Sequence, residues 1–199
     1  GSGGGTGGAG WGRAQGEDPK KPLLKWTEAK GFRLHGFTLD GEDRIDELVV
    51  LAGTSVGVRL ESLRLRGFNR TGLRLDGFVA PLDRPFEATR LRFAGNPTRE
   101  KDEAIRLGGT VDPGAVRNVR FLGCCFVGPF RSGAVLGVST SGVEFRRNRF
   151  FNVVAALDYP ERPRVDEVGL AVDSNTFYNV KSGIALGSLP APSSEGIRV

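Results

Sequence analysis

Arginine recurs at matching places in a pattern that repeats along this chain. One set of matching positions reads Thr38, Arg64, Arg92, Cys125, Arg149 and Thr176. A guanidinium group presents a planar fork of N–H donors, which pairs well with a carboxylate or a sulfate group. If the repeat brings these side chains together, Arg64, Arg92 and Arg149 form a positive stripe that could bind acidic groups.

Two further sets of outward positions are also rich in charge. The first reads Val50, Arg74, Arg106, Val135, Ala156 and Ala185, and the second reads Arg33, Arg59, Glu87, Arg120, Glu144, Ala171 and Arg198. Arg74 and Arg106 therefore join the candidate binding residues. The chain has 28 basic and 23 acidic residues, a net charge of +5. The simpler interpretation is a solvated face that nearby acids neutralise, and the sequence leaves both interpretations open.

The repeat that must position these arginines is clearest in its leucines. Short apolar-x-apolar runs end at Leu51, Leu75, Leu107, Leu136, Leu157 and Leu186. Their intervals range from 21 residues (Leu136 to Leu157) to 32 residues (Leu75 to Leu107), which is too irregular for a helical heptad. Such spacing is typical of a solenoid whose loops accept insertions.

Other positions of the repeat follow the same register. Three apolar columns read Phe32, Val58, Phe86, Val119, Val143, Leu170, Ile197; Leu34, Leu60, Ala88, Phe121, Phe145, Val172, Val199; and Leu39, Leu65, Phe93, Phe126, Phe150, Phe177. Alternate residues are apolar, as in β-strands with one buried face. The pattern predicts rungs of three short strands that stack in parallel at roughly 4.8 Å per rung.

Two further columns predict turns. One contains only glycine and asparagine, and its members are Gly41, Gly67, Gly95, Gly128, Asn152 and Asn179. These residue types enter the left-handed backbone region most easily, so we expect positive φ at most of these positions. The other column reads Phe37, Leu63, Leu91, Cys124, Asn148 and Asn175. It predicts a ladder of buried amides at Asn148 and Asn175.

The stretches VEFRRNRFFNVVAALDY and LAVDSNTFYNVKSGIALG resemble the repeat of the pectate-lyase-like superfamily, and the similarity covers roughly residues 24–199. The resemblance implies an all-β fold, a right-handed parallel β-helix of about six rungs. We expect residues 1–22 to be a flexible linker or tag remnant and residues 23–199 to be the β-helix domain. Since the last rung begins at Ile197, we expect a truncated piece of a longer solenoid.

The two cysteines predict no disulfide and no metal site. Cys124 falls in an inward column, where it would be a small core residue, and Cys125 should point outward from the same strand. Neighbouring residues of one strand face opposite sides and are poorly placed to bond to each other. Two adjacent cysteines without partner ligands do not bind a metal ion.

The resemblance also supplies an enzymatic alternative. In β-helix enzymes that act on acidic polysaccharides, the cleft lies along one sheet, which here would be formed by the leucine strands. Arg74 and Arg106 would then neutralise a substrate carboxylate, and Asp76 would help to hold a calcium ion. Other polar candidates are Asp158 on the sheet and, in flanking loops, Lys101, Asp102, Glu103, Asp112, Tyr159, Arg162 and Arg164. The same face continues as Val135, Ala156 and Ala185, which is too apolar for a long sugar-acid cleft.

We therefore interpret the chain as a non-catalytic β-helix module of a larger protein that binds or displays an extended surface, with acidic polysaccharide as the expected ligand. A degenerate or truncated lyase or epimerase and a structural spacer are the alternatives. We expect no cofactor, with calcium only under the lyase alternative. Expected partners are a polysaccharide and other domains, without nucleic acid or membrane insertion. The module resembles β-helix segments of large bacterial envelope proteins, which implies a location outside the cytoplasm or in the cell envelope.

Overall fold

The chain folds into an all-parallel β-solenoid of about five turns, consistent with the predicted right-handed parallel β-helix. The computed structural model describes residues 18–96, 102–108, 115–137, 139–160, 169–186 and 197–198, and within these ranges it contains strands and no helix. The strands are β1 (Leu24–Thr27), β2 (Arg33–His35), β3 (Thr38–Thr54), β4 (Arg59–Glu61), β5 (Arg64–Val79), β6 (Phe86–Thr89), β7 (Arg92–Ala94), β8 (Glu103–Leu107), β9 (Val116–Leu122), β10 (Cys125–Leu136), β11 (Thr140–Arg146), β12 (Arg149–Tyr159), β13 (Leu170–Asp173), β14 (Thr176–Leu186) and β15 (Ile197–Arg198).

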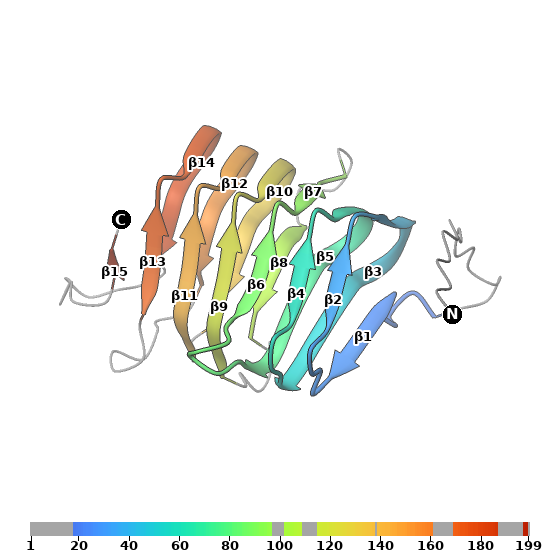
Figure 1. Ribbon diagram of the computed structural model, residues 1–199. Helices are drawn as coiled ribbons and strands as arrows, with labels where there is room; N and C mark the ends of the chain where they lie inside the picture. Colours follow the sequence, from blue (N-terminus) through green and yellow to red (C-terminus); the bar gives the residue numbers. More distant parts are fainter. Residues whose placement is uncertain are drawn as a thin grey trace.

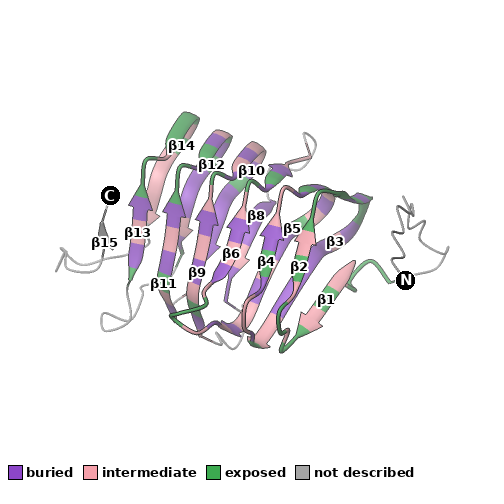
Figure 2. Ribbon diagram, in the orientation of Figure 1, coloured by how far each residue is buried: buried purple, intermediate pink, exposed green. Residues whose placement is uncertain are grey.

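The strands form two layers that face each other across the core (Figure 1). The short-strand layer consists of β2, β4, β6, β9, β11, β13 and β15, and the long-strand layer consists of β1, β3, β5, β7, β8, β10, β12 and β14. Figure 2 shows bands along the strands, because buried residues alternate with more exposed ones. Among the described residues, none belongs to a helix that could cross a bilayer.

Most turns have two strands rather than the three predicted short ones. In β3, β5, β10, β12 and β14 one continuous strand replaces the second and third predicted strands, and among the described residues only the turn with β7 and β8 keeps them apart. The bend lies inside the strand, since the parallel ladder resumes after it: Val127 pairs with Phe151 before the bend and Phe130 with Val153 after it. A bulge of this kind turns the chain without ending the ladder.

The three apolar columns are confirmed wherever the structure describes them. Phe86 pairs with Val119, and Phe121 pairs with Phe145. The phenylalanines of the long-strand layer stack face to face: ring centroids lie 5.1 Å apart for Phe93–Phe126 and 4.4 Å for Phe126–Phe150. Val199 lies outside the described residues.

The leucine column is correct at five of its six positions and wrong at Leu157. Leu51, Leu75, Leu107 and Leu136 are successive cross-strand partners. The next partners are Tyr159 and Leu186, because Leu157 pairs with Ala134 and Ile184 instead. A strand with alternating apolar residues looks the same after a shift of two residues, so the pattern alone could not set this register. Asp158 consequently takes the outward place predicted for Ala156.

The turn column is correct at three of its six positions. Gly67, Asn152 and Asn179 have positive φ, at 65°, 54° and 51°. Gly41, Gly95 and Gly128 do not, and a different constraint requires glycine there. A Cβ at Gly128 would lie 1.8 Å from the carbonyl oxygen of Asn152, and one at Gly95 would lie 2.4 Å from that of Pro129. These glycines permit close approach of backbones rather than an unusual φ.

The predicted amide ladder is present, with Asn148 buried and Asn175 partly buried. Asn148 donates to the carbonyl oxygen of Phe121 and accepts from the amide of Cys124, at 3.0 and 2.8 Å. Asn175 repeats the arrangement one turn on: it donates to Phe145 and accepts from the amide of Asn148, both at 2.8 Å. The ladder fixes the corner at which β11 leads into β12, and so the relative position of the two layers.

Candidate functional site

The predicted arginine stripe exists on the outside of the long-strand layer. Arg64 and Arg92 are direct cross-strand partners, and Cys125 separates Arg92 from Arg149. All three arginine side chains are exposed. Within the part of the chain that the structure describes, none of the three guanidinium groups makes an ion pair or hydrogen bond. Their charge is therefore not compensated by any acid among the described residues.

A rigid floor positions the stripe. Each stripe residue is followed by an inward residue of the phenylalanine column: Arg92 by Phe93, Cys125 by Phe126 and Arg149 by Phe150. These rings are fully buried and stacked. Because close-packed rings leave the backbone little freedom, the spacing of the arginines is set by the strand spacing of about 4.8 Å per turn.

A second outward row runs beside the stripe, two residues further along each strand. It begins with Asp40 and Arg66, which form an ion pair at 2.7 Å. It then becomes an apolar row of Ala94, Val127, Phe151 and Tyr178, which are successive cross-strand partners. Tyr178 is 66% exposed, and its ring centroid lies 6.1 Å from that of Phe151.

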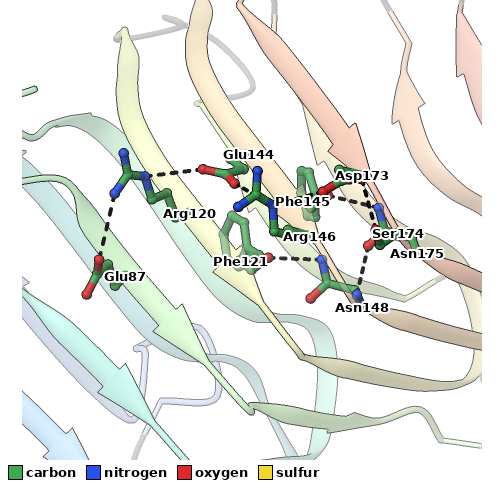
Figure 3. A network of polar contacts seen from close by, with 10 residues as sticks. All are labelled: Glu87, Arg120, Phe121, Glu144, Phe145, Arg146, Asn148, Asp173, Ser174 and Asn175. Atoms are coloured by element: carbon green, nitrogen blue, oxygen red, sulfur yellow. Dashed lines mark hydrogen bonds and ion pairs between the residues drawn. The ribbon is translucent and has the colours of Figure 1, made fainter. Parts of the chain in front are cut away.

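The short-strand layer carries arginine differently. An ion-pair ladder of alternating sign runs over this layer, and its members are Arg59, Glu87, Arg120, Glu144, Arg146 and Asp173. Figure 3 shows the part of the ladder from Glu87 to Asp173. Arg120 lies between Glu87 and Glu144, with N–O distances of 3.9 and 3.3 Å. Three guanidinium groups thus face three carboxylates, and the expectation of a neutralised face holds here.

The same layer pairs Arg33 with Glu61, and Nε of Arg33 lies 3.1 Å from Oε2 of the carboxylate. This hydrogen bond lowers the pKa of Glu61 below its ordinary value.

Arg74, Asp76 and Arg106 lie together on the leucine strands, as predicted, but they are engaged with one another and with two further acids. Nη1 of Arg74 lies 2.9 Å from Glu47, and Nη2 lies 3.5 Å from Asp76. Arg106 holds both carboxylate oxygens of Glu103. We call these five residues the acid–arginine cluster.

The cluster contains acids that the sequence did not place there. Glu47 was not predicted, and Glu103 was expected in a flanking loop but is the first residue of β8. Each lies three residues before an outward position of the leucine strand, at Val50 and Arg106, and that spacing was the available signal. Tyr159, also expected in a loop, is buried in β12.

Beyond Arg106 the leucine-strand face changes character. Val135 follows and is almost fully buried, and then comes Asp158, which accepts a hydrogen bond from the hydroxyl of Ser132 at 3.0 Å. Asp102, which directly precedes β8, is buried. The other loop candidates, Lys101, Asp112, Arg162 and Arg164, lie outside the described residues.

The cysteines lie as predicted. Cys124 is buried and Cys125 is partly exposed in the stripe, and both are free thiols. Burial raises the pKa of the Cys124 thiol to about 12. Among the described residues, no group of three or more histidine, cysteine or acidic side chains could hold a metal ion.

No family model matches this chain, and neither a curated protein nor a solved structure is recognisably similar to it.

Proposed function

We propose that this chain is a non-catalytic module, built on a β-helix of the pectate-lyase-like kind, that binds acidic polysaccharide through the arginine stripe. One observation carries the proposal: Arg64, Arg92 and Arg149 are exposed and have no acidic partner among the described residues, whereas the ladder on the other layer is neutralised. Unpaired guanidinium groups on a fixed spacing suit a polymer that carries carboxylate or sulfate groups.

A polysaccharide lyase or epimerase is the second candidate. Arg74 and Arg106 are cross-strand partners, and Nε of Arg74 is buried without a hydrogen-bond partner. Such groups could meet a sugar carboxylate. One feature weighs against it: Val135, which is almost fully buried, occupies the next outward position, so the face beyond Arg106 offers no charged group to a long sugar acid.

The test measures binding and turnover of the same polymers. Polygalacturonate, alginate and chondroitin sulfate would be titrated into the protein, and ultraviolet absorbance would report unsaturated products. We expect binding without turnover, weakened about tenfold by Arg64→Ala with Arg92→Ala, which corresponds to about 1.4 kcal/mol. Because exposed charges are screened by salt, this loss should shrink as the salt concentration rises.

Arg66→Ala is the matched control, because this arginine lies on the same strand as Arg64 but pairs with Asp40. It should change the affinity much less. Turnover that Arg74→Ala or Arg106→Ala abolishes would replace the proposal with the lyase or epimerase. If the folded protein neither binds nor turns over these polymers, the remaining interpretation is a structural spacer.

A further inference from the structure

The apolar row beside the stripe has no counterpart on the ion-pair ladder. On the short-strand layer, each arginine of the ladder faces a carboxylate on a neighbouring strand. On the long-strand layer, the positions two residues beyond Arg92, Cys125 and Arg149 are Ala94, Val127 and Phe151. The row ends at Tyr178, the most exposed large apolar side chain in β12 and β14.

We propose that Phe151 and Tyr178 form a platform for a sugar ring, and that the ligand lies along the stack axis with its acidic groups on the arginine stripe. This inference rests on the proposed function and deepens it, because it assigns the ligand's class and direction. The C–H face of a pyranose ring is apolar and packs against an aromatic ring, while its hydroxyl groups stay in water.

The register fixes the footprint. Arg149 and Phe151 both lie on β12, and their side chains point outward from the same face, two residues apart. From Tyr178 on β14 to Arg64 on β5, the face crosses β12, β10 and β7, a span of roughly 19 Å at the spacing of parallel strands. That length suits an oligosaccharide rather than a single sugar.

The charge density distinguishes this ligand from a nucleic acid. A single strand of DNA presents a phosphate at every nucleotide and binds best in a continuous basic groove. Here the stripe has three cations over four strands, without an acidic partner among the described residues, and Cys125 interrupts it; the cation beside it at Arg66 is neutralised by Asp40. A polymer with apolar ring faces and moderately spaced acids fits this surface better.

The experiment compares Tyr178→Ala with Tyr178→Phe, which keeps the ring, and with Leu82→Ala, a substitution at an exposed apolar residue in the turn between β5 and β6. Probes are polygalacturonate oligomers, inorganic polyphosphate and oligothymidylate, titrated calorimetrically. Tyr178→Ala should weaken polygalacturonate binding about five- to tenfold, the scale of one lost aromatic contact. Binding of polyphosphate, which has no ring, should stay within about twofold, and both control variants should behave like the unaltered protein.

Each outcome decides a different point. If the arginine double variant weakens polygalacturonate binding but Tyr178→Ala does not, the platform is wrong and the proposed function stands. If Tyr178→Ala weakens polyphosphate as much as polygalacturonate, the effect is structural and the platform is again wrong. Tighter binding of oligothymidylate than of polygalacturonate would assign the face to nucleic acid. No binding of any polymer would overturn both proposals.

Discussion

The short-strand layer and the long-strand layer place arginine on the same kind of outward position, at the same spacing, with opposite consequences. On the first, Arg120 lies between Glu87 and Glu144, so its charge is used within the protein. On the second, Arg64 and Arg92 face each other with no acid between them. Two adjacent like charges disfavour the fold slightly. The difference teaches that arginine content alone does not show which face carries uncompensated positive charge, whereas the pairing of each arginine across the strands does.

The largest expected effect is a loss of stability from a substitution that separates two of the strands carrying the stripe. Gly128→Ala would place a Cβ 1.8 Å from the carbonyl oxygen of Asn152, so β10 and β12 must move apart. We expect a loss of at least about 3 kcal/mol in the free energy of unfolding, measured by denaturant titration. Gly183→Ala is the control, since nothing lies within 4 Å of its Cβ position, and it should be near neutral. Equal effects of the two variants would contradict the close approach.

The next effect concerns the corner that joins the two layers. Asn148→Ala removes the partners of the Cys124 amide and the Phe121 carbonyl, both of which are buried. We expect a cost of about 2–3 kcal/mol, because unsatisfied buried polar groups retain their desolvation penalty. Thr176→Ala, at an exposed position one turn away, should cost less than about 0.5 kcal/mol in the same unfolding measurement. A neutral Asn148→Ala would show that the amide ladder is dispensable.

A third variant should convert the neutral face into a second stripe. Glu87→Gln with Glu144→Gln leaves Arg59 and Arg120 without the carboxylates that they face. We expect the affinity for polygalacturonate to rise about threefold at low salt. Glu28→Gln with Asp83→Asn makes the same change in net charge in the turns between β1 and β2 and between β5 and β6, and it should raise the affinity less. An equal gain in both double variants would mean that net charge alone governs binding.

The smallest effect is expected from modifying Cys125 within the stripe. At pH 8, Cys124 stays protonated and buried, because burial raises its pKa to about 12, so only Cys125 should react in the folded protein. Iodoacetate adds a carboxylate between Arg92 and Arg149, whereas iodoacetamide adds a neutral group of similar size. We expect the first product to bind polygalacturonate about twofold more weakly than the second. Mass spectrometry would confirm one modified residue, and two would contradict the burial of Cys124.

The fold could be predicted because each inward column repeats the same kind of apolar residue from turn to turn. The columns that contain Phe86 and Phe93 follow directly from the alternation of apolar and polar residues along each strand. The register at Leu157 could not be predicted. Two residues separate Val127 from Phe130 in β10, whereas one residue separates their partners Phe151 and Val153 in β12. The predicted pairing of Leu136 with Leu157 needs two residues fewer still, and a period-2 pattern looks the same after a shift of two. The prediction of positive φ was wrong at Gly128 for a related reason. The sequence shows that glycine recurs at this position, but only the packing of neighbouring turns shows that the cause is a close approach of two backbones.

The contrast between the two layers could be predicted from the sequence. The outward columns already place Arg120 between Glu87 and Glu144 and Arg64 beside Arg92, and the cross-strand register confirms both. The partners of Arg74 and Arg106 could not be predicted in this way, because Glu47 and Glu103 lie outside the columns, three residues before an outward position.

The most direct test removes two arginines from each layer and compares the losses. Arg64→Ala with Arg92→Ala and Arg59→Ala with Arg120→Ala change the net charge equally, so a calorimetric titration with polygalacturonate at low and high salt isolates position from charge. Thermal melting would confirm that both variants are folded. The account predicts about a tenfold loss at low salt for the first variant and less than about twofold for the second. Equal losses, or a larger loss for the second, would contradict the assignment of binding to the unpaired stripe.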